Sequence, residues 1–230
     1  MTERYLARSM QDAVPKVLVV VHGQLAKHPR VHRLLIWIYT RVIGEKRVES
    51  GMLPLARSGD CVWDIGANVG FYTRQFLDAV GPSGHVVAVD PVPAHVEELR
   101  SLGHAEQLTV VAAALARSEG EMSFVVDGQA SHLGEGDGAL TVRVARGDSL
   151  LEEGIAAPNV VKIDVEGFEG EVLDGLPVAL RSARAVMVEV HFAALTRRGL
   201  TKEPARIVAL LRGHGFSVRW LDSSHLLASR

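Results

Sequence analysis

This sequence has almost no cysteine and no excess of basic charge. Its 230 residues include one cysteine, Cys61, which excludes an intrachain disulfide and a zinc site built from cysteines. The 27 Asp and Glu residues nearly balance the 25 Lys and Arg residues, and the net charge is −2. This balance excludes the broad basic surface from which general nucleic-acid-binding proteins draw their affinity, so we expect no nucleic-acid partner.

Long apolar runs are also missing. The two longest, residues 17–21 and 34–39, are far shorter than the roughly 20 residues that cross a bilayer. Charged side chains precede the first run, which is not typical of a signal peptide. With 47% hydrophobic and 23% charged residues, the composition is that of a folded globular protein. We therefore expect a cytoplasmic protein without a membrane span.

Residues 1–58 are expected to form an N-terminal helical extension. Apolar residues recur every three or four positions from Val31 to Val42, directly after Pro29, which is typical of an amphipathic helix that begins at a proline. The extension could cover a ligand-binding cleft, contact the substrate or form a homodimer surface. The sequence leaves these three roles open.

From residue 59 onward, short apolar runs alternate with amphipathic stretches. This pattern predicts an α/β domain, residues 59–230, with a mostly parallel, doubly wound sheet covered by helices on both faces. A glycine-rich stretch at 127–138 predicts the tip of an inserted β-hairpin, and an antiparallel hairpin is expected to close the chain. The expected core strands are 61–65, 85–89, 108–114, 160–163 and 185–190; the expected helices are 69–80, 93–102, 167–176 and 204–212; the expected hairpins pair 122–126 with 140–144 and 216–221 with 225–228.

A glycine-containing loop, Asp64-Ile-Gly-Ala-Asn-Val-Gly70, follows the first strand. Ligands of open parallel sheets lie at the carboxyl ends of the strands, and Gly66 and Gly70 allow a tight turn and a close approach. A dinucleotide fingerprint requires a glycine where Asn68 stands, and Asp64 would repel a pyrophosphate but attract an ammonium group. Since Asp90, at the end of the second strand, can accept both ribose hydroxyls, the pattern predicts an S-adenosylmethionine site.

Charged side chains gather at the ends of the fourth and fifth expected strands. Lys162, Asp164 and Glu166 alternate, so in an extended strand all three point to the same side. Glu189 and His191 repeat this alternation on the next strand. We expect these five side chains to converge where the sulfonium of the methyl donor lies. Burying several charges only for stability is costly, which favours a functional role over a purely structural cluster.

Three segments of the chain resemble the FkbM family of S-adenosylmethionine-dependent methyltransferases. The first is Asp64 to Thr73, which adds Tyr72 to the expected cofactor-binding residues. The second is Val161-Lys-Ile-Asp-Val-Glu-Gly-Phe-Glu169, and the third is Glu189-Val-His191. The segments follow one another in the family's order, each on the expected element, and the resemblance extends from about residue 49 to the C-terminus.

The resemblance implies a Rossmann-like class I methyltransferase that transfers a methyl group in line to a hydroxyl of a sugar, glycolipid or natural product. Such an enzyme must align the acceptor oxygen with the methyl carbon. His191 is expected to be the general base, because the unperturbed pKa of histidine lies near neutrality. Asp164, which is also expected to border the cofactor, is the second candidate for the base. Lys162 is expected to pair with Asp164 or Glu189 and so fix the carboxylates.

The acceptor is expected to contact Glu166, and Ser131 and His132 in the glycine-rich stretch. A Mg²⁺ or Mn²⁺ ion is the other use for the carboxylates around His191. No spacing specific for a metal supports this alternative, so S-adenosylmethionine is the expected cofactor and a divalent metal is not expected.

Three other functions compete with this interpretation. An NAD(P)-dependent oxidoreductase is disfavoured by Asp64 and by the missing middle glycine. A nucleic-acid methyltransferase is disfavoured by the charge balance and by the lack of an Asn/Asp-Pro-Pro-aromatic tetrad. A catalytically silent binding protein with the same fold is disfavoured by the intact set of charged residues at the strand ends.

Overall fold

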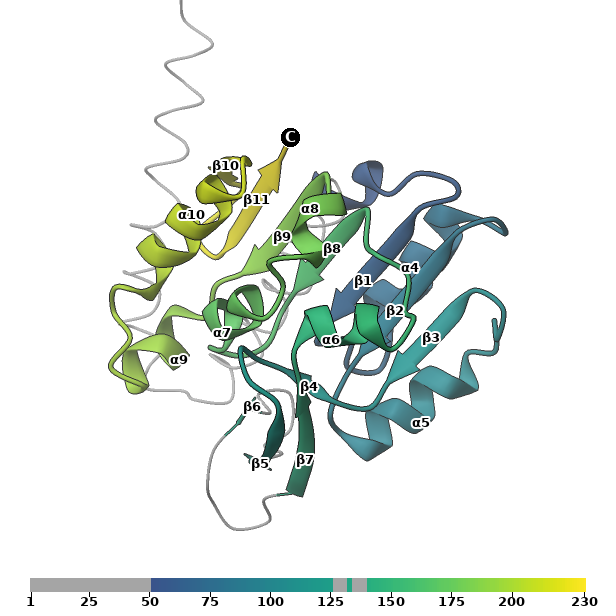
Figure 1. Ribbon diagram of the computed structural model, residues 1–230, viewed down its shortest axis with the longest axis horizontal. Coiled ribbons are helices and arrows are strands. Elements are labelled where there is room, and N and C mark those ends of the chain that lie inside the picture. Colours follow the sequence, from purple (N-terminus) through teal and green to yellow (C-terminus); the bar gives the residue numbers. More distant parts are fainter. Residues whose placement is uncertain (1–50, 126–131, 134–139) are drawn as a thin grey trace, which may run out of the picture. The chain divides into compact units, whose positions relative to one another are not determined.

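The computed structural model describes residues 51–125, 132–133 and 140–230, which form an α/β domain with two sheets (Figure 1). The larger sheet has seven strands in the order β10-β11-β9-β8-β1-β2-β3. Its strands are β1 (Cys61–Ile65), β2 (His85–Val89), β3 (Leu108–Val111), β8 (Val160–Ile163), β9 (Ala185–Glu189), β10 (Ser217–Trp220) and β11 (His225–Ser229). The pairs among β3, β2, β1, β8 and β9 are parallel, whereas β11 is antiparallel to both of its neighbours.

Successive residues of each core strand pack into opposite apolar cores. In β1, Trp63 and Ile65 belong to one core and Val62 to the other. In β8, Val161 belongs to the core that contains Trp63, and Val160 to the core that contains Val62. All five are at most 1% exposed, and each fully buried side chain of this size stabilises the fold by about 1.5–3 kcal/mol. A sheet with two covered faces explains why these strands read as continuous apolar runs.

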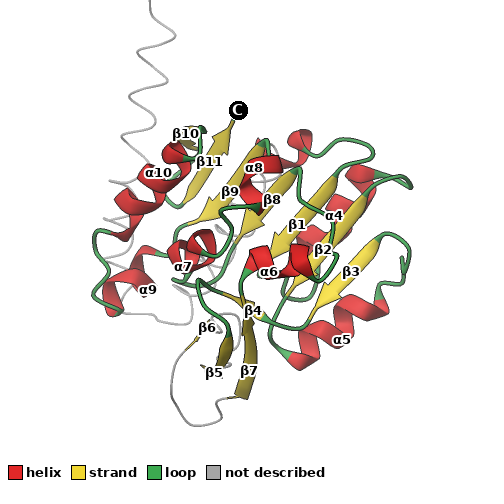
Figure 2. Cartoon of the chain, viewed as in Figure 1, coloured by secondary structure: helices red, strands yellow, loops and turns green. Residues whose placement is uncertain are grey.

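The helices divide between the two faces of the large sheet (Figure 2). Helices α4 (Phe71–Val80) and α5 (Pro93–Ser101) contribute apolar side chains to the core that contains Val62. The remaining helices contribute to the core that contains Trp63; they are α6 (Gly147–Glu152), α7 (Glu169–Asp174), α8 (Ala179–Ser182), α9 (Phe192–Arg197) and α10 (Glu203–Gly213). One turn of 3-10 helix, η2 (Leu53–Leu55), precedes the first strand.

The smaller sheet has the order β4-β7-β5-β6. Its strands are β4 (Ala114–Leu115), β5 (Gly120–Val125), β6 (His132–Leu133) and β7 (Leu140–Ala145). Strands β5 and β7 are antiparallel, which confirms the inserted hairpin. Val142 and Val144 pack with Val92 and Phe168 in a third apolar cluster. The insertion therefore supports Phe168, which lies in the loop that follows β8.

The sheet, its five parallel strands and the closing hairpin are where the sequence predicts them. One predicted strand, 108–114, is instead divided. Strand β3 ends at Val111, the amide of Ala113 donates to the carbonyl of Val111, and Ala114 begins β4, which pairs with β7 in the smaller sheet. The predicted helix at 167–176 is also shorter: α7 begins at Glu169, because Gly167 has a φ of +97°.

The expected helical extension, residues 1–58, falls mostly outside the described residues. Its predicted cap, acceptor-binding or dimerisation roles stay predictions. Within residues 51–58, Met52 is 1% exposed and packs into the core that contains Val62. None of the helices in the described ranges combines the length and the apolar character that a membrane crossing requires.

Candidate active site

The loop between β1 and α4 turns tightly and packs against the backbone that follows β8. The amides of Gly66 and Ala67 both donate to the carbonyl of Val89, at 2.9 and 3.1 Å. Gly66 has a φ of +78°, and a Cβ atom built on it would lie 1.8 Å from the carbonyl oxygen of Asp164. This approach, rather than flexibility, explains why the sequence has a glycine here.

Asn68 occupies the position where a dinucleotide fingerprint has its second glycine. Its φ is +50°, a left-handed conformation that asparagine tolerates better than most residues. Its amide donates to Oδ2 of Asp90 at 2.8 Å. Oδ1 of Asp90 accepts from the amide of Val92 at 2.9 Å and lies 3.0 Å from Nδ1 of His95. Asp90 therefore joins the ends of β1 and β2.

Asp64 and Lys162 form a buried ion pair under the same loop. Asp64 has no exposed surface and accepts from Oγ1 of Thr73 at 2.6 Å. Nζ of Lys162 lies 3.1 Å from Asp64 and 3.4 Å from Asp164, and donates to the carbonyl of Gly66 at 2.9 Å. Burial alone would lower the pKa of Lys162, but the carboxylates of Asp64 and Asp164 raise it, so the ammonium stays charged. The ion pair, together with the hydrogen bond from Lys162 to Gly66, therefore anchors the loop to β8.

A cavity of about 110 Å³ opens at the carboxyl ends of β1 and β2. Its lining includes Gly66, Asn68, Asp90, Asp164 and Glu166. Apolar residues and one histidine also line it, among them Val92, Leu115, Phe168 and His95.

Of the residues predicted to bind the cofactor, Gly66, Asn68, Asp90 and Asp164 line this cavity. Three others take different positions. Asp64 lies under the loop, as described above. Gly70 caps the N-terminus of α4. Tyr72 packs on Phe76, with Nζ of Lys162 5.3 Å from the centre of its ring.

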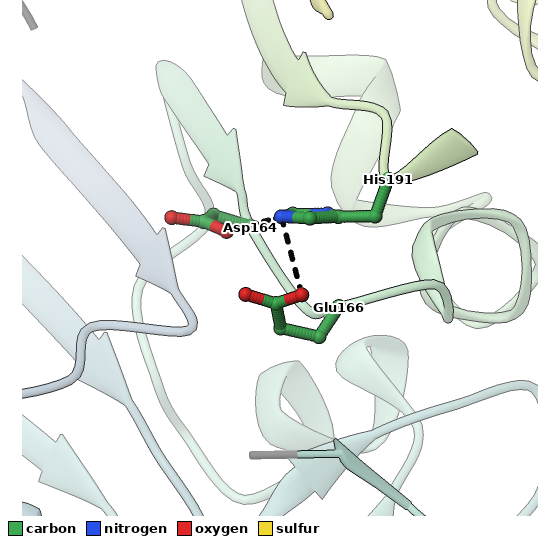
Figure 3. Close-up of side chains that lie close together, drawn as sticks. All are labelled: Asp164, Glu166 and His191. Atoms are coloured by element: carbon green, nitrogen blue, oxygen red, sulfur yellow. Dashed lines mark ion pairs between the residues drawn. The ribbon is translucent and has the colours of Figure 1, made fainter. Parts of the chain in front are cut away.

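Four carboxylates surround the imidazole of His191. Two of them, Asp164 and Glu166, also line the cavity, and Figure 3 shows these two beside the ring. Nε2 lies 3.5 Å from Oδ1 of Asp164, 3.5 Å from Oε2 of Glu166 and 3.9 Å from Oε1 of Glu189. Nδ1 lies 2.7 Å from Oε1 of Glu169, which is fully buried. The charged side chains that the sequence places at the ends of β8 and β9 thus lie together in the structure. Lys162 contacts this group through its ion pair with Asp164.

These carboxylates control the charge of the imidazole. Burial alone would lower the pKa of His191, but the hydrogen bond to Glu169 and the charges of Asp164, Glu166 and Glu189 raise it to about 10. In this arrangement the imidazole is protonated at neutral pH and can donate a proton but not accept one. The general-base role that the sequence suggests for His191 stays a prediction, and an imidazole held in the charged form does not favour it.

Glu166 lies beside His191, but a backbone turn places it there and not the strand alternation that the sequence suggests. Strand β8 ends at Ile163, so the alternation of Lys162, Asp164 and Glu166 does not continue along a strand. Glu166 instead has a φ of +52°, a left-handed turn that is rare for a glutamate. Burial raises the pKa of Glu166; the charge of His191 opposes this shift, and the charges of Asp164 and the other glutamates add to it.

Sequence reasoning missed Glu169 and His95 as members of the site. The signal for Glu169 was its place in the segment that resembles the family, three residues after Glu166. His95 had no signal, since its proximity to Asp90 depends on how α5 packs. Ser131 lies outside the described residues, and of His132 the structure describes only the backbone, in β6. Among the described residues, one group has the ligand types and spacing for a metal ion: Asp164, Glu166 and His191.

Comparison with solved structures shows the fold. A methyltransferase FkbM from Methylobacillus flagellatus KT superposes with a TM-score of 0.53 at 14% identity, covering 75% of this chain and 44% of that one. This chain thus spans less than half the length of that protein. Cofactor-bound Rv0187 from MTB superposes with a TM-score of 0.50 at 18% identity, covering 81% of this chain and 78% of that one. The fold is the Rossmann-like class I methyltransferase fold.

Two relatives are similar in sequence. The hexuronic acid methyltransferase AglP of Haloferax volcanii is 33% identical over 173 residues, which cover 73% of this chain and 70% of that protein. The 31-O-demethyl-FK506 methyltransferase FkbM of Streptomyces tacrolimicus is 31% identical over 200 residues, which cover 70% of this chain and 74% of that protein.

A family model also matches residues 64–218, from the end of β1 to the start of β10. It describes the methyltransferase FkbM domain. The matched range contains the cavity, the buried Asp64–Lys162 pair and the carboxylates around His191. The chain therefore belongs to the FkbM family and is an S-adenosylmethionine-dependent methyltransferase.

Proposed function

We propose that this enzyme methylates a hydroxyl group of a hexuronic acid or of a related sugar. The observation that carries the proposal is that Asp164 and Glu166 belong both to the wall of the cavity and to the group of carboxylates around His191. A methyl donor in the cavity and a hydroxyl beside His191 would therefore meet at these two residues. The acceptor class is supported by the similarity to AglP, whose name specifies a hexuronic acid.

The residues of the cavity fit S-adenosylmethionine. Asp90 presents a carboxylate that suits ribose hydroxyls, and Val92, Leu115 and Phe168 offer apolar surface for an adenine ring. The absence of a side chain at Gly66 lets this loop lie directly against the backbone of Asp164, so that both residues line the cavity. The cofactor, when bound, supplies a methyl group on a positively charged sulfonium, and the acidic wall of Asp164 and Glu166 suits that charge.

The acceptor hydroxyl would lie between Glu166, Glu189 and His191. Protonated His191 donates from Nε2 and orients an acceptor oxygen, while Lys162 holds Asp164 from the opposite side. The hydroxyl proton passes to a carboxylate, for which Asp164 and Glu189 are the candidates. The enzyme gains most of its rate by holding the acceptor oxygen in line, because alignment converts a bimolecular step into a unimolecular one.

An exposed aromatic pair next to His191 offers a surface for the acceptor. Phe192 and Trp220 are 43% and 42% exposed, and their ring centres lie 5.9 Å apart. Phe192 begins α9 at the end of β9, and Trp220 ends β10, which runs in the same direction as β9. Both rings therefore lie at the edge of the sheet where the carboxylates lie. The apolar face of a sugar ring packs well on such rings.

The experiment is a methyl-transfer assay with isotope-labelled S-adenosylmethionine. The acceptors are glycosides of uronic acids, the matching neutral sugars, and 31-O-demethyl-FK506. We expect a methyl ether on a uronic acid glycoside, with the rate greatly reduced in Asp164→Asn and unchanged in Glu106→Gln, an exposed glutamate before β3 at the opposite edge of the sheet. Transfer to no sugar but to 31-O-demethyl-FK506 would reject the proposed acceptor class.

A further inference from the structure

We propose that Asp164, Glu166 and His191 bind a divalent cation that holds the acceptor; the acceptor part of this inference rests on the proposed function. One oxygen or nitrogen atom of each residue lies within 4.8 Å of the others. Nε2 of His191 lies 3.5 Å from both carboxylate oxygens but has no hydrogen bond in the described structure. A histidine binds a metal in its neutral form, so the ion would replace the proton that Nε2 carries in the metal-free protein and would take over the orientation of the acceptor. Adjacent ligands about 2.1 Å from one ion lie about 3.0 Å apart in octahedral geometry, so small side-chain movements would complete the site.

The two oxygens of Asp164 have separate partners, which leaves one available to an ion. Oδ2 faces Nζ of Lys162 at 3.4 Å, and Oδ1 faces Nε2 of His191 at 3.5 Å. The side chains of Asp164 and Glu166 are 28% and 29% exposed, and both line the cavity, so solvent and an ion can reach them. Lys162 therefore orients Asp164 without blocking the oxygen that faces His191.

Glu169 gives a second, independent indication of a metal ligand. Its carboxylate is fully buried, and Oε1 accepts from the amide of Gly167 at 2.8 Å and lies 2.7 Å from Nδ1 of His191. Oε2 is buried and has no hydrogen-bond partner among the described residues. A carboxylate on the far nitrogen of the ring is the arrangement that fixes metal-binding histidines, because it holds the ring and directs the other nitrogen to the metal.

The charge of the site also favours a cation. Asp164, Glu166, Glu189 and Glu169 lie within 3.9 Å of a single imidazole, and the nearby charge of Lys162 is shared with Asp64. A hexuronic acid would bring one more carboxylate to this edge. A divalent ion reconciles the acidic edge with an acidic acceptor, since it attracts both.

The ligand types indicate which ion. Two carboxylate oxygens suit Mg²⁺ and Mn²⁺, whereas an imidazole nitrogen favours a transition metal. We therefore infer Mn²⁺ or a similar divalent transition ion, with the remaining coordination positions open to the acceptor hydroxyl and a neighbouring acceptor oxygen. Bound to the ion, the hydroxyl would ionise more readily.

The reaction then balances with groups that are present. The acceptor O–H bond breaks, and Glu189, which is 34% exposed and outside the ligand set, takes the proton. The acceptor oxygen forms a bond to the methyl carbon, and the electrons of the C–S bond return to sulfur. The products are the methyl ether and S-adenosylhomocysteine.

The test measures Mn²⁺ binding directly, from the electron paramagnetic resonance signal of free Mn²⁺ during titration of the chelator-treated enzyme. We expect one site per chain, with affinity weakened about 10–100-fold in Glu166→Gln and His191→Gln. Glu106→Gln is the matched control and should bind as the wild type does. Thermal unfolding of each variant identifies any that fails to fold, and the comparison then rests on the other. A wild type that does not bind Mn²⁺, or variants that bind equally well, would overturn the inference.

A parallel titration separates this inference from the proposed function. S-adenosylhomocysteine is titrated calorimetrically into the enzyme with excess chelator, and methyl transfer is assayed with and without chelator. Methylation of a uronic acid glycoside at an unchanged rate in chelator would overturn the metal site and leave the proposed function intact. Mn²⁺ binding without methylation of any sugar would support the metal site and reject the acceptor.

Discussion

Nδ1 of His191 lies 2.7 Å from the carboxylate of Glu169, a residue with no exposed surface that the sequence places 22 positions earlier. This contact fixes the ring of His191 and leaves Nε2 facing Asp164 and Glu166. Glu169 touches neither the cavity nor the side of the ring where the acceptor would bind. We therefore propose that Glu169 is a positioning residue, whose effect should appear in the rate of methyl transfer rather than in cofactor binding.

Replacing Glu169 by glutamine should therefore lower kcat by about 10–100-fold while the affinity for S-adenosylhomocysteine changes little. Mn²⁺ affinity should fall together with kcat. The matched control is Glu171→Gln, on the same helix, because Glu171 is also buried but pairs with Arg198. Equal losses of kcat in both variants would mean that Glu169 is only a structural residue.

Gly66→Ala should abolish cofactor binding. A Cβ atom at Gly66 would lie 1.8 Å from the backbone oxygen of Asp164, so the loop must move. Gly103→Ala is the control: its φ of +77° matches the +78° of Gly66, but no atom lies within 4 Å of its Cβ position. Both variants carry the left-handed strain of about 1–2 kcal/mol, which thermal unfolding measures. Only Gly66→Ala should lose S-adenosylhomocysteine binding in calorimetry, and retained binding would contradict the described loop.

Lys162→Met should destabilise the fold by about 3–5 kcal/mol, because it leaves the buried carboxylate of Asp64 without its cation. The double variant Asp64→Asn, Lys162→Met removes both charges and should recover much of this loss. Urea unfolding of the single and double variants measures the coupling. Additive losses would show that the two side chains do not interact in solution.

Phe192→Ala should raise KM for the sugar acceptor and leave kcat nearly unchanged, if the exposed pair Phe192 and Trp220 binds the sugar ring. Val178→Ala is a suitable control, since Val178 is 47% exposed just before α8, away from the carboxylates around His191. Steady-state kinetics at varied acceptor concentration measure KM and kcat for both variants. An unchanged KM in Phe192→Ala would remove this surface from the acceptor site.

The ion pair of Asp60 and Arg184 should give a pH-dependent stability. Burial alone would raise the pKa of Asp60, but the hydrogen bond from Arg184 and the amide of Arg57 lower it below its usual value of 3.8. A lowered pKa stabilises the fold at pH values above the pKa of the unfolded state. This stabilisation is lost as the pH falls through the pKa of the folded state. Asp60→Asn should thus lower the free energy of unfolding by about 1–3 kcal/mol at neutral pH. The difference in stability between wild type and variant should shrink below about pH 4. A difference that is constant with pH would contradict the pairing.

The sequence predicts most of the large sheet because its strands have two buried faces and are separated by amphipathic helices. It fails where tertiary contacts decide the outcome. Residues 108–114 are uniformly apolar, and only pairing with β7 divides them between the two sheets. The convergence of charged residues was predictable, since the ends of neighbouring parallel strands must meet. The left-handed turn at Glu166, the support from Glu169 and the charge of His191 were not, because each depends on contacts that sequence spacing does not encode.

A crystal structure with bound S-adenosylhomocysteine is the most direct test of the claim that donor and acceptor meet at Asp164 and Glu166. The account predicts that the adenosine lies against Asp90 and that the sulfur faces these two carboxylates, on the side of His191. A sulfur that faces away from Asp164 and Glu166, or a cofactor bound outside this cavity, would contradict it.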